Sequence, residues 1–207
     1  MQPRLWPALV ACSLALLAVP VAAVPVLAQD TVRVRGTIER IDGPVLVVKS
    51  RDGAELKVTM TDPPVYVALV KASVADIKPG MFVGATGLPL ADGSQRAVEV
   101  HIFPEAMRGT GDGHRPSDLA PQATMTNANV DQMVAGNDGH TLTMKYKDGE
   151  KKLVVTPETV VVTYAAGDRA ELKPGTGVFI GAARKMPDGT LQTPRLNYGR
   201  GGLMPPM

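Results

Sequence analysis

The sequence is poor in cysteine, in aromatic rings and in net charge. Cysteine occurs once, at Cys12, and 4% of the residues are aromatic. Because Cys12 lies in an apolar run near the N-terminus, a chain that loses this run on export has no disulfide and must be held by its own cores. The few rings and the formal net charge of +2 argue against the stacking platforms and basic grooves that bind nucleic acid. No nucleic-acid partner is therefore expected.

Residues that carry chemistry are also scarce. His101, His114 and His140 are the three histidines, and no two of them are near in sequence. A zinc-type centre needs two or three such ligands at short spacing, and no serine or cysteine stands in a recognisable nucleophile elbow. The sequence therefore predicts no catalytic residue, no cofactor and no enzymatic activity. Each histidine is predicted to lie at the surface, His101 because it alternates with Val100 and Ile102 along a strand.

The N-terminal segment predicts export. Arg4 is the only charge before Asp30, and residues 5–28 are almost wholly apolar. The run closes at Ala28 with the short residues that a signal peptidase requires. A retained membrane anchor is the alternative, because the run is long enough to span a bilayer, but two prolines interrupt it. We therefore expect a signal peptide over residues 1–28, a periplasmic or secreted protein, and no stable membrane span after cleavage.

One stretch occurs twice. Residues 76–80, Asp-Ile-Lys-Pro-Gly, return 95 positions later as residues 171–175, Glu-Leu-Lys-Pro-Gly. Lys-Pro-Gly suits a type II turn, because proline presets φ at the second position and glycine accepts the positive φ of the third. Other turn signals recur in the same order at offsets of 95 to 97 residues. This order predicts a duplicated module.

Short alternating stretches lie between the turns. Residues 31–41 and 142–146 alternate polar and apolar side chains, which is the period of a half-buried strand. Each copy contains about five such stretches and one short helical turn, which together are typical of a small five-stranded barrel. The predicted fold is all-β, with two tandem small OB-like β-barrels after the signal segment. One β-sandwich built from both halves is the alternative.

The expected boundaries follow from these elements. We expect module one at residues 30–103, a connector rich in glycine and proline at 104–123, module two at 124–198 and a tail at 199–207. If there are two modules, each is expected to own a core. The first predicted core contains Val34, Ile38, Leu46, Val48, Leu56, Val58, Val83 and Val100. The second contains Val130, Leu142, Met144, Leu153, Val155, Ile180 and Leu196.

The order of the motifs resembles a known family. The first copy carries Gly36-Thr37-Ile38, Asp52-Gly53, Ile77-Lys78-Pro79-Gly80 and Asp92-Gly93. The second keeps Asp148-Gly149, Leu172-Lys173-Pro174-Gly175 and Asp188-Gly189, and departs at its entry, where Asn127-Ala128-Asn129-Val130 replaces the glycine motif. This pattern resembles the OB-like domain of unknown function found in many secreted bacterial proteins, often in tandem. The resemblance implies a small barrel and supplies no catalytic residues.

The candidate metal ligands are one polar pair and one pair of methionines. Asp112 and His114 lie with two arginines in the connector, where a salt bridge or a cap for the module junction is expected. Met204 and Met207 supply thioethers of the kind that hold Cu(I). The sequence predicts a non-enzymatic binding or scaffolding protein of the cell envelope, without a metal, whose partner is an envelope protein or a small ligand. The alternative is an envelope copper carrier that uses methionine and histidine.

Overall fold

The chain is all-β, as predicted. A computed structural model describes residues 30–136 and 139–207, so the predicted signal peptide lies outside the described residues. The twelve strands are β1 (Thr31–Asp42), β2 (Val45–Ser50), β3 (Glu55–Lys71), β4 (Phe82–Pro89), β5 (Gln95–Ile102), β6 (Gly113–Pro116), β7 (Thr124–Gly136), β8 (Gly139–Tyr146), β9 (Gly149–Val155), β10 (Val160–Ala166), β11 (Gly177–Lys185) and β12 (Leu191–Gly199). No helix in the described ranges is long and apolar enough to cross a membrane.

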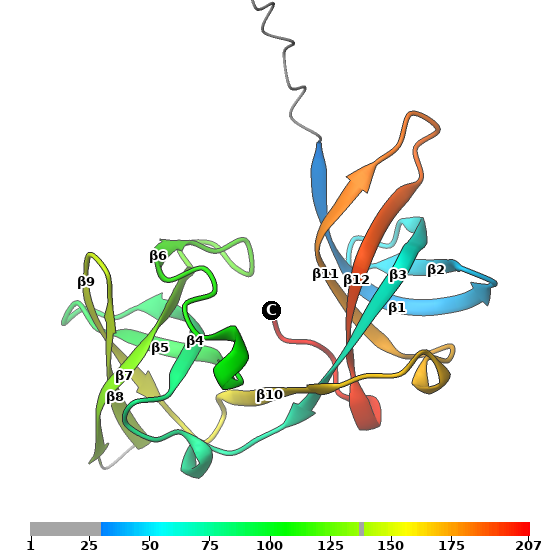
Figure 1. Cartoon of the computed structure of the whole chain (residues 1–207). Coiled ribbons are helices and arrows are strands. Elements are labelled where there is room, and N and C mark those ends of the chain that lie inside the picture. Colours follow the sequence, from blue (N-terminus) through cyan, green and yellow to red (C-terminus); the bar gives the residue numbers. More distant parts are fainter. Residues whose placement is uncertain (1–29, 137–138) are drawn as a thin grey trace, which may run out of the picture.

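The strands close into two five-stranded barrels. The first barrel has the order β12-β11-β1-β2-β3 and closes by parallel pairing of β12 with β3. The second barrel has the order β5-β4-β7-β8-β9 and closes by parallel pairing of β5 with β9. Figure 1 shows the blue and cyan strands of the first barrel beside the orange and red ones, with the green and yellow strands in the other barrel. Each barrel therefore takes its strands from both halves of the sequence.

This exchange of strands corrects the predicted cores and the predicted module boundaries. Nearly all of the nominated residues are buried, but Val83 and Val100 belong to the core of the second barrel. Ile180 and Leu196 belong to the core of the first barrel, together with Val34 and its neighbours. The prediction that each contiguous copy owns a core is therefore wrong. Residues 30–103 supply three strands to one barrel and two to the other.

Hydrogen bonds at the repeated turns show how the halves are joined. The backbone N–H of Gly80 donates to the carbonyl oxygen of Val130 at 2.7 Å, and that of Gly175 donates to Ile38 at 2.8 Å. The turn of each half is thus bonded to the first strand of the other half. Turn residues and strand periodicity are local signals, and they are the same whether each half forms its own barrel or the halves exchange strands. They therefore do not specify which barrel the β4–β5 or the β11–β12 hairpin joins.

Strands β3 and β10 run between the two barrels, and their pairing connects one barrel to the other. They pair antiparallel with Leu69 opposite Tyr164, two positions that are 95 residues apart. The two parallel ladders correspond in the same way. Ala68 pairs with Tyr198 in the β3–β12 ladder, and Thr163 pairs with Ile102 in the β10–β5 ladder. A local two-fold axis therefore passes through the β3–β10 ladder, with one barrel on each side of it (Figure 1).

The predicted connector and tail are both structured. Strand β6 lies in the connector and pairs with β7. The tail ends at Met207, which is buried against Leu69 and Val162 in a small cluster of its own. Both segments lie beside the junction of the barrels instead of serving as free linkers.

Both Lys-Pro-Gly segments form the predicted turns, and their glycines are expected to matter for stability. Gly80 has φ of 85° and Gly175 has φ of 89°. A Cβ at either position would meet nothing within 4 Å, so the penalty of alanine comes from the backbone conformation alone. We expect Gly80→Ala and Gly175→Ala each to lower the free energy of unfolding by about 1 kcal/mol, as measured by urea titration.

Asparagine is the matched control at these turns, because its side chain tolerates positive φ better than alanine does. Gly80→Asn is expected to lose less stability than Gly80→Ala. Equal stability of the alanine variants and the parent chain would contradict the assigned turn.

Candidate functional site

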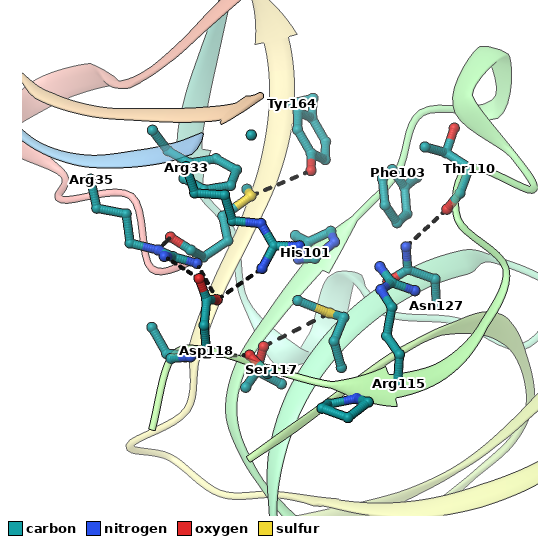
Figure 2. A pocket seen from close by; sticks show the side chains of 17 residues that line it. Arg33, Arg35, His101, Phe103, Thr110, Arg115, Ser117, Asp118, Asn127 and Tyr164 are labelled. Atoms are coloured by element: carbon teal, nitrogen blue, oxygen red, sulfur yellow. Dashed lines mark hydrogen bonds and ion pairs between the residues drawn. The ribbon is translucent and has the colours of Figure 1, made fainter. Parts of the chain in front are cut away.

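A cavity of about 320 Å³ lies between the two barrels. This volume is within the range of small-molecule sites. Both barrels contribute to its walls, and so does β10 through Tyr164, as Figure 2 shows. The lining residues are Arg33, Arg35, Thr86, His101, Phe103, Thr110, Arg115, Pro116, Ser117, Asp118, Leu119, Met125, Asn127, Tyr164, Phe179, Gly181 and Met207.

On the second barrel, a glycine makes room for two polar side chains. Gly84 of β4 pairs with Asn127 on β7 and with His101 on β5. A Cβ on Gly84 would lie 2.0 Å from His101 Nε2 and 2.7 Å from Asn127 Oδ1, a separation that no side chain can occupy. Glycine is therefore what allows His101 and Asn127 to meet above the strand.

His101 is buried, which corrects the predicted surface position. The alternation is right, since His101 points away from the barrel core that Val100 fills. That outer face is covered, however, by Phe103 and Tyr164, whose rings lie edge-on to the imidazole at centroid distances of 4.7 and 5.9 Å. His101 retains 3% of its exposure. Periodicity predicts the direction of a side chain, but it does not predict what packs against it.

A buried carboxylate orients the imidazole. Glu99 has no exposed surface, and a carboxylate in such a place needs hydrogen-bond donors. Thr86 Oγ1 donates to it at 2.8 Å, and His101 Nδ1 lies 3.3 Å from its other oxygen. The remaining ring nitrogen, Nε2, is turned toward Gly84 and Asn127. Burial first, and then the charge of Glu99, raise the pKa of the Tyr164 hydroxyl well above its usual value.

The first barrel presents an arginine and an aromatic ring at the matching positions. Arg35 pairs with Phe179 where Asn127 pairs with Gly84 in the second barrel. The Arg35 guanidinium carbon lies 5.2 Å from the centre of the Phe179 ring, a cation–π distance. Its Nε donates to the main-chain oxygen of Met207 at 2.6 Å. The two barrels therefore share a framework and offer different side chains to the cavity.

One carboxylate connects the barrels at the cavity wall. Asp118, between β6 and β7, forms ion pairs with Arg35 at 2.8 Å and with Arg33 at 3.1 Å. Both arginines come from β1 of the first barrel. The hydrogen bond and charge of Arg35, joined by those of Arg33, lower the pKa of the Asp118 carboxyl to about 2. Asp118 and the two arginines thus form a clamp across the junction.

Replacing Asp118 is expected to reduce stability in a pH-dependent manner. Because its pKa in the folded protein is about 2 and its ordinary value is 3.8, the stabilisation is complete well above pH 4 and is lost as the pH falls toward 2. The carboxylate is nearly half exposed, so solvent screening limits the loss in Asp118→Asn to about 1 kcal/mol at pH 7. Urea unfolding between pH 7 and pH 2.5 is expected to show the difference shrinking with falling pH.

The control for the clamp is Asp131→Asn. Asp131 pairs with Lys145 at 3.0 Å between neighbouring strands of one barrel. It is expected to show a smaller loss at pH 7. A difference between Asp118→Asn and the parent chain that stays constant down to pH 2.5 would contradict the role of the ionised carboxylate.

Arg115 brings a positive charge to the cavity without an acidic partner. It lies on β6, and its Nη1 donates to the carbonyl oxygen of Gly111 at 2.7 Å. It forms no ion pair with any residue in the described ranges. Burial, and then the charge of Arg33, lower the pKa of its guanidinium. Three arginines therefore line the cavity, and Asp118 is the one acidic lining residue among those described.

Asn127 brings an acceptor without a donor. Its Nδ2 donates to the carbonyl oxygen of Thr110 at 2.8 Å. Its Oδ1 is buried and receives no hydrogen bond from the described chain, although buried polar atoms are normally paired. The side chain as a whole keeps 4% of its exposure. A cavity that holds an unneutralised cation and an unpaired acceptor has the means to bind a polar ligand.

The candidate ligands named from the sequence each have contacts of their own in the structure. Asp112 Oδ1 accepts from the backbone N–H of Lys147 at 3.0 Å, and His114 Nδ1 lies 2.8 Å from Thr126 Oγ1. Met204 is exposed beside Gly177, whereas Met207 is buried with its sulfur 3.7 Å from the Tyr164 hydroxyl. Within the ranges 30–136 and 139–207, no group of three or more His, Cys, Asp or Glu residues is placed to hold a metal ion.

Comparison with protein-family models, with curated proteins and with solved structures finds no match for this chain. The function of the site is therefore inferred from the residues that line it.

Proposed function

We propose that this chain is a non-enzymatic, extracytoplasmic binding protein that holds a small organic anion in the cavity between its barrels. The observation that carries the proposal is the excess of guanidinium groups at the cavity, and above all the unpaired charge of Arg115. A guanidinium group presents several N–H donors that match a carboxylate. The extracytoplasmic location follows from the predicted signal peptide, and the OB-like duplication stays a prediction.

Apolar groups in the cavity favour an organic anion over an inorganic one. The rings of Phe103, Tyr164 and Phe179 line it, together with the side chain of Met125. Phe103 and Tyr164 are nearly parallel, with an interplanar angle of 15° and centroids 5.4 Å apart. Burial of an apolar ligand body against such surfaces contributes about 25 cal/mol per Å². Arg35 is mostly buried, so solvent screens its attraction for an anion less than it screens that of the exposed Arg115.

A pair of compounds that differ in charge tests the proposal. 3-Phenylpropionate and 3-phenylpropan-1-ol have similar apolar bodies, and only the first is an anion at pH 7. Titration of the mature chain, followed by NMR, is expected to show tighter binding of the carboxylate, with shift changes at His101, Phe103 and Arg115. Arg115→Gln is expected to weaken that binding about tenfold, since a hydrogen bond to a charged group contributes about 1.5–3 kcal/mol.

The control variant is Arg96→Gln, which removes an exposed arginine from the same barrel without touching the cavity. It is expected to bind the carboxylate as the parent chain does. Equal affinity for the alcohol and the carboxylate, or binding that is insensitive to Arg115→Gln, would contradict the proposed function.

A further inference from the structure

The orientation of the Asn127 amide indicates what else the ligand must carry. The carbonyl oxygen of Thr110 can only accept a hydrogen bond, so the NH₂ group of Asn127 must face it. The amide oxygen is then turned toward Gly84, at the cavity wall that Asn127 lines, and nothing in the described chain donates to it. A ligand that completes this site therefore needs a donor as well as an anionic group.

His101 adds a second acceptor at the same place. His101 Nδ1 lies 3.3 Å from a carboxyl oxygen of Glu99, and in the tautomer that carries its single proton on Nδ1 the ring donates to that oxygen. Nε2 is then an acceptor, and it shares the space above Gly84 with Asn127 Oδ1. The buried Glu99 carboxyl group lies on the Nδ1 side of the ring. Two acceptors in front of a buried carboxylate favour a group that is both cationic and rich in N–H donors.

The cationic end of the site lies close to this acceptor end. Asn127 Nδ2 and Arg115 Nη2 are 3.1 and 3.4 Å from the same point, the position where a Cβ on Gly111 would lie. A carboxylate on Arg115 and an ammonium group on Asn127 are therefore compatible with one short molecule. An α-amino acid carries these two groups on a single carbon atom.

From this juxtaposition, which rests on the proposed function, we infer that the ligand is a zwitterionic amino acid with an apolar side chain. Its carboxylate pairs with Arg115, and its ammonium group donates to Asn127 Oδ1 and His101 Nε2. Its side chain packs against the rings of Phe103 and Tyr164, which line the same cavity.

Three probes of similar size separate the two charges of this ligand. Phenylalanine carries both, 3-phenylpropionate lacks the ammonium group, and 2-phenylethylamine lacks the carboxylate. Calorimetric titration of the mature chain at pH 7 is expected to give phenylalanine about tenfold tighter binding than either analogue, because each analogue leaves either Arg115 or the buried Asn127 oxygen without its partner.

Two variants assign the charges to residues. Arg115→Gln is expected to weaken phenylalanine and 3-phenylpropionate about tenfold and to leave 2-phenylethylamine unchanged. Asn127→Ala is expected to do the reverse, weakening phenylalanine and 2-phenylethylamine. Thermal unfolding first establishes that each variant folds, and the three-probe comparison on the parent chain decides the inference without either variant.

Equal affinity for phenylalanine and 3-phenylpropionate would overturn the zwitterion and leave the anion-binding function standing. Failure of both carboxylates to bind would overturn the inference and the proposed function together.

Discussion

Cutting the chain between Gly109 and Thr110 is expected to give two fragments that do not fold alone but assemble with each other. The fragment 30–109 holds three strands of the first barrel and two of the second, and 110–207 holds the rest. Each fragment thus lacks part of both cores, and the apolar burial that offsets chain entropy requires the partner. The cut falls in an exposed turn, where Gly109 has φ of 81°, so it removes no core contact.

Size-exclusion chromatography and urea unfolding test this expectation. Each fragment alone is expected to show no cooperative transition, and an equimolar mixture is expected to elute as a 1:1 complex that unfolds cooperatively. A cooperative transition in either fragment alone, as a monomer or through self-association, would mean that a half can complete a barrel by itself. The strand exchange described here would then not be required for folding.

The sequence predicts the elements of this fold well because those elements are local. Gly80 and Gly175 have the positive φ that their turns require, and the alternating stretches become strands whose inward residues are buried. What the sequence does not predict is the barrel to which each hairpin belongs. Val83 pairs with Ala128 of the other half at a sequence separation of 45 residues, and no periodicity within one half distinguishes that partner from Gly36.

The cavity was beyond the reach of the sequence for a related reason. Its polar residues come from β1, β4, β5, β6, β7 and β10 and from the loops on either side of β6, and nothing in their local sequence marks any of them as a site residue. Arg35 and Asn127 become site residues only because the two barrels face one another. Comparing the two halves of the sequence does give one signal. Gly84 and Phe179 occupy matching positions in the two barrels, and their side chains differ most strongly in size.

A core substitution in one half is expected to destabilise strands of the other half. Leu196 is fully buried in the core of the first barrel, although it lies on β12. Leu196→Ala is expected to lower the free energy of unfolding by about 2–5 kcal/mol, through lost burial and the cavity that remains. Because β1–β3 share this core, their amides are expected to lose protection in native-state hydrogen exchange more than those of β7–β9.

Val100→Ala is the matched variant, because Val100 holds the corresponding place in the second barrel and is also fully buried. It removes two methyl groups and is expected to cost about 2 kcal/mol. Its loss of protection is expected in β7–β9, the reverse of the pattern for Leu196→Ala. If Leu196→Ala instead exposed β7–β9 and Val100→Ala exposed β1–β3, each copy would own its core. The two barrels beside the cavity would then each be built from one contiguous half of the chain, without exchange of strands.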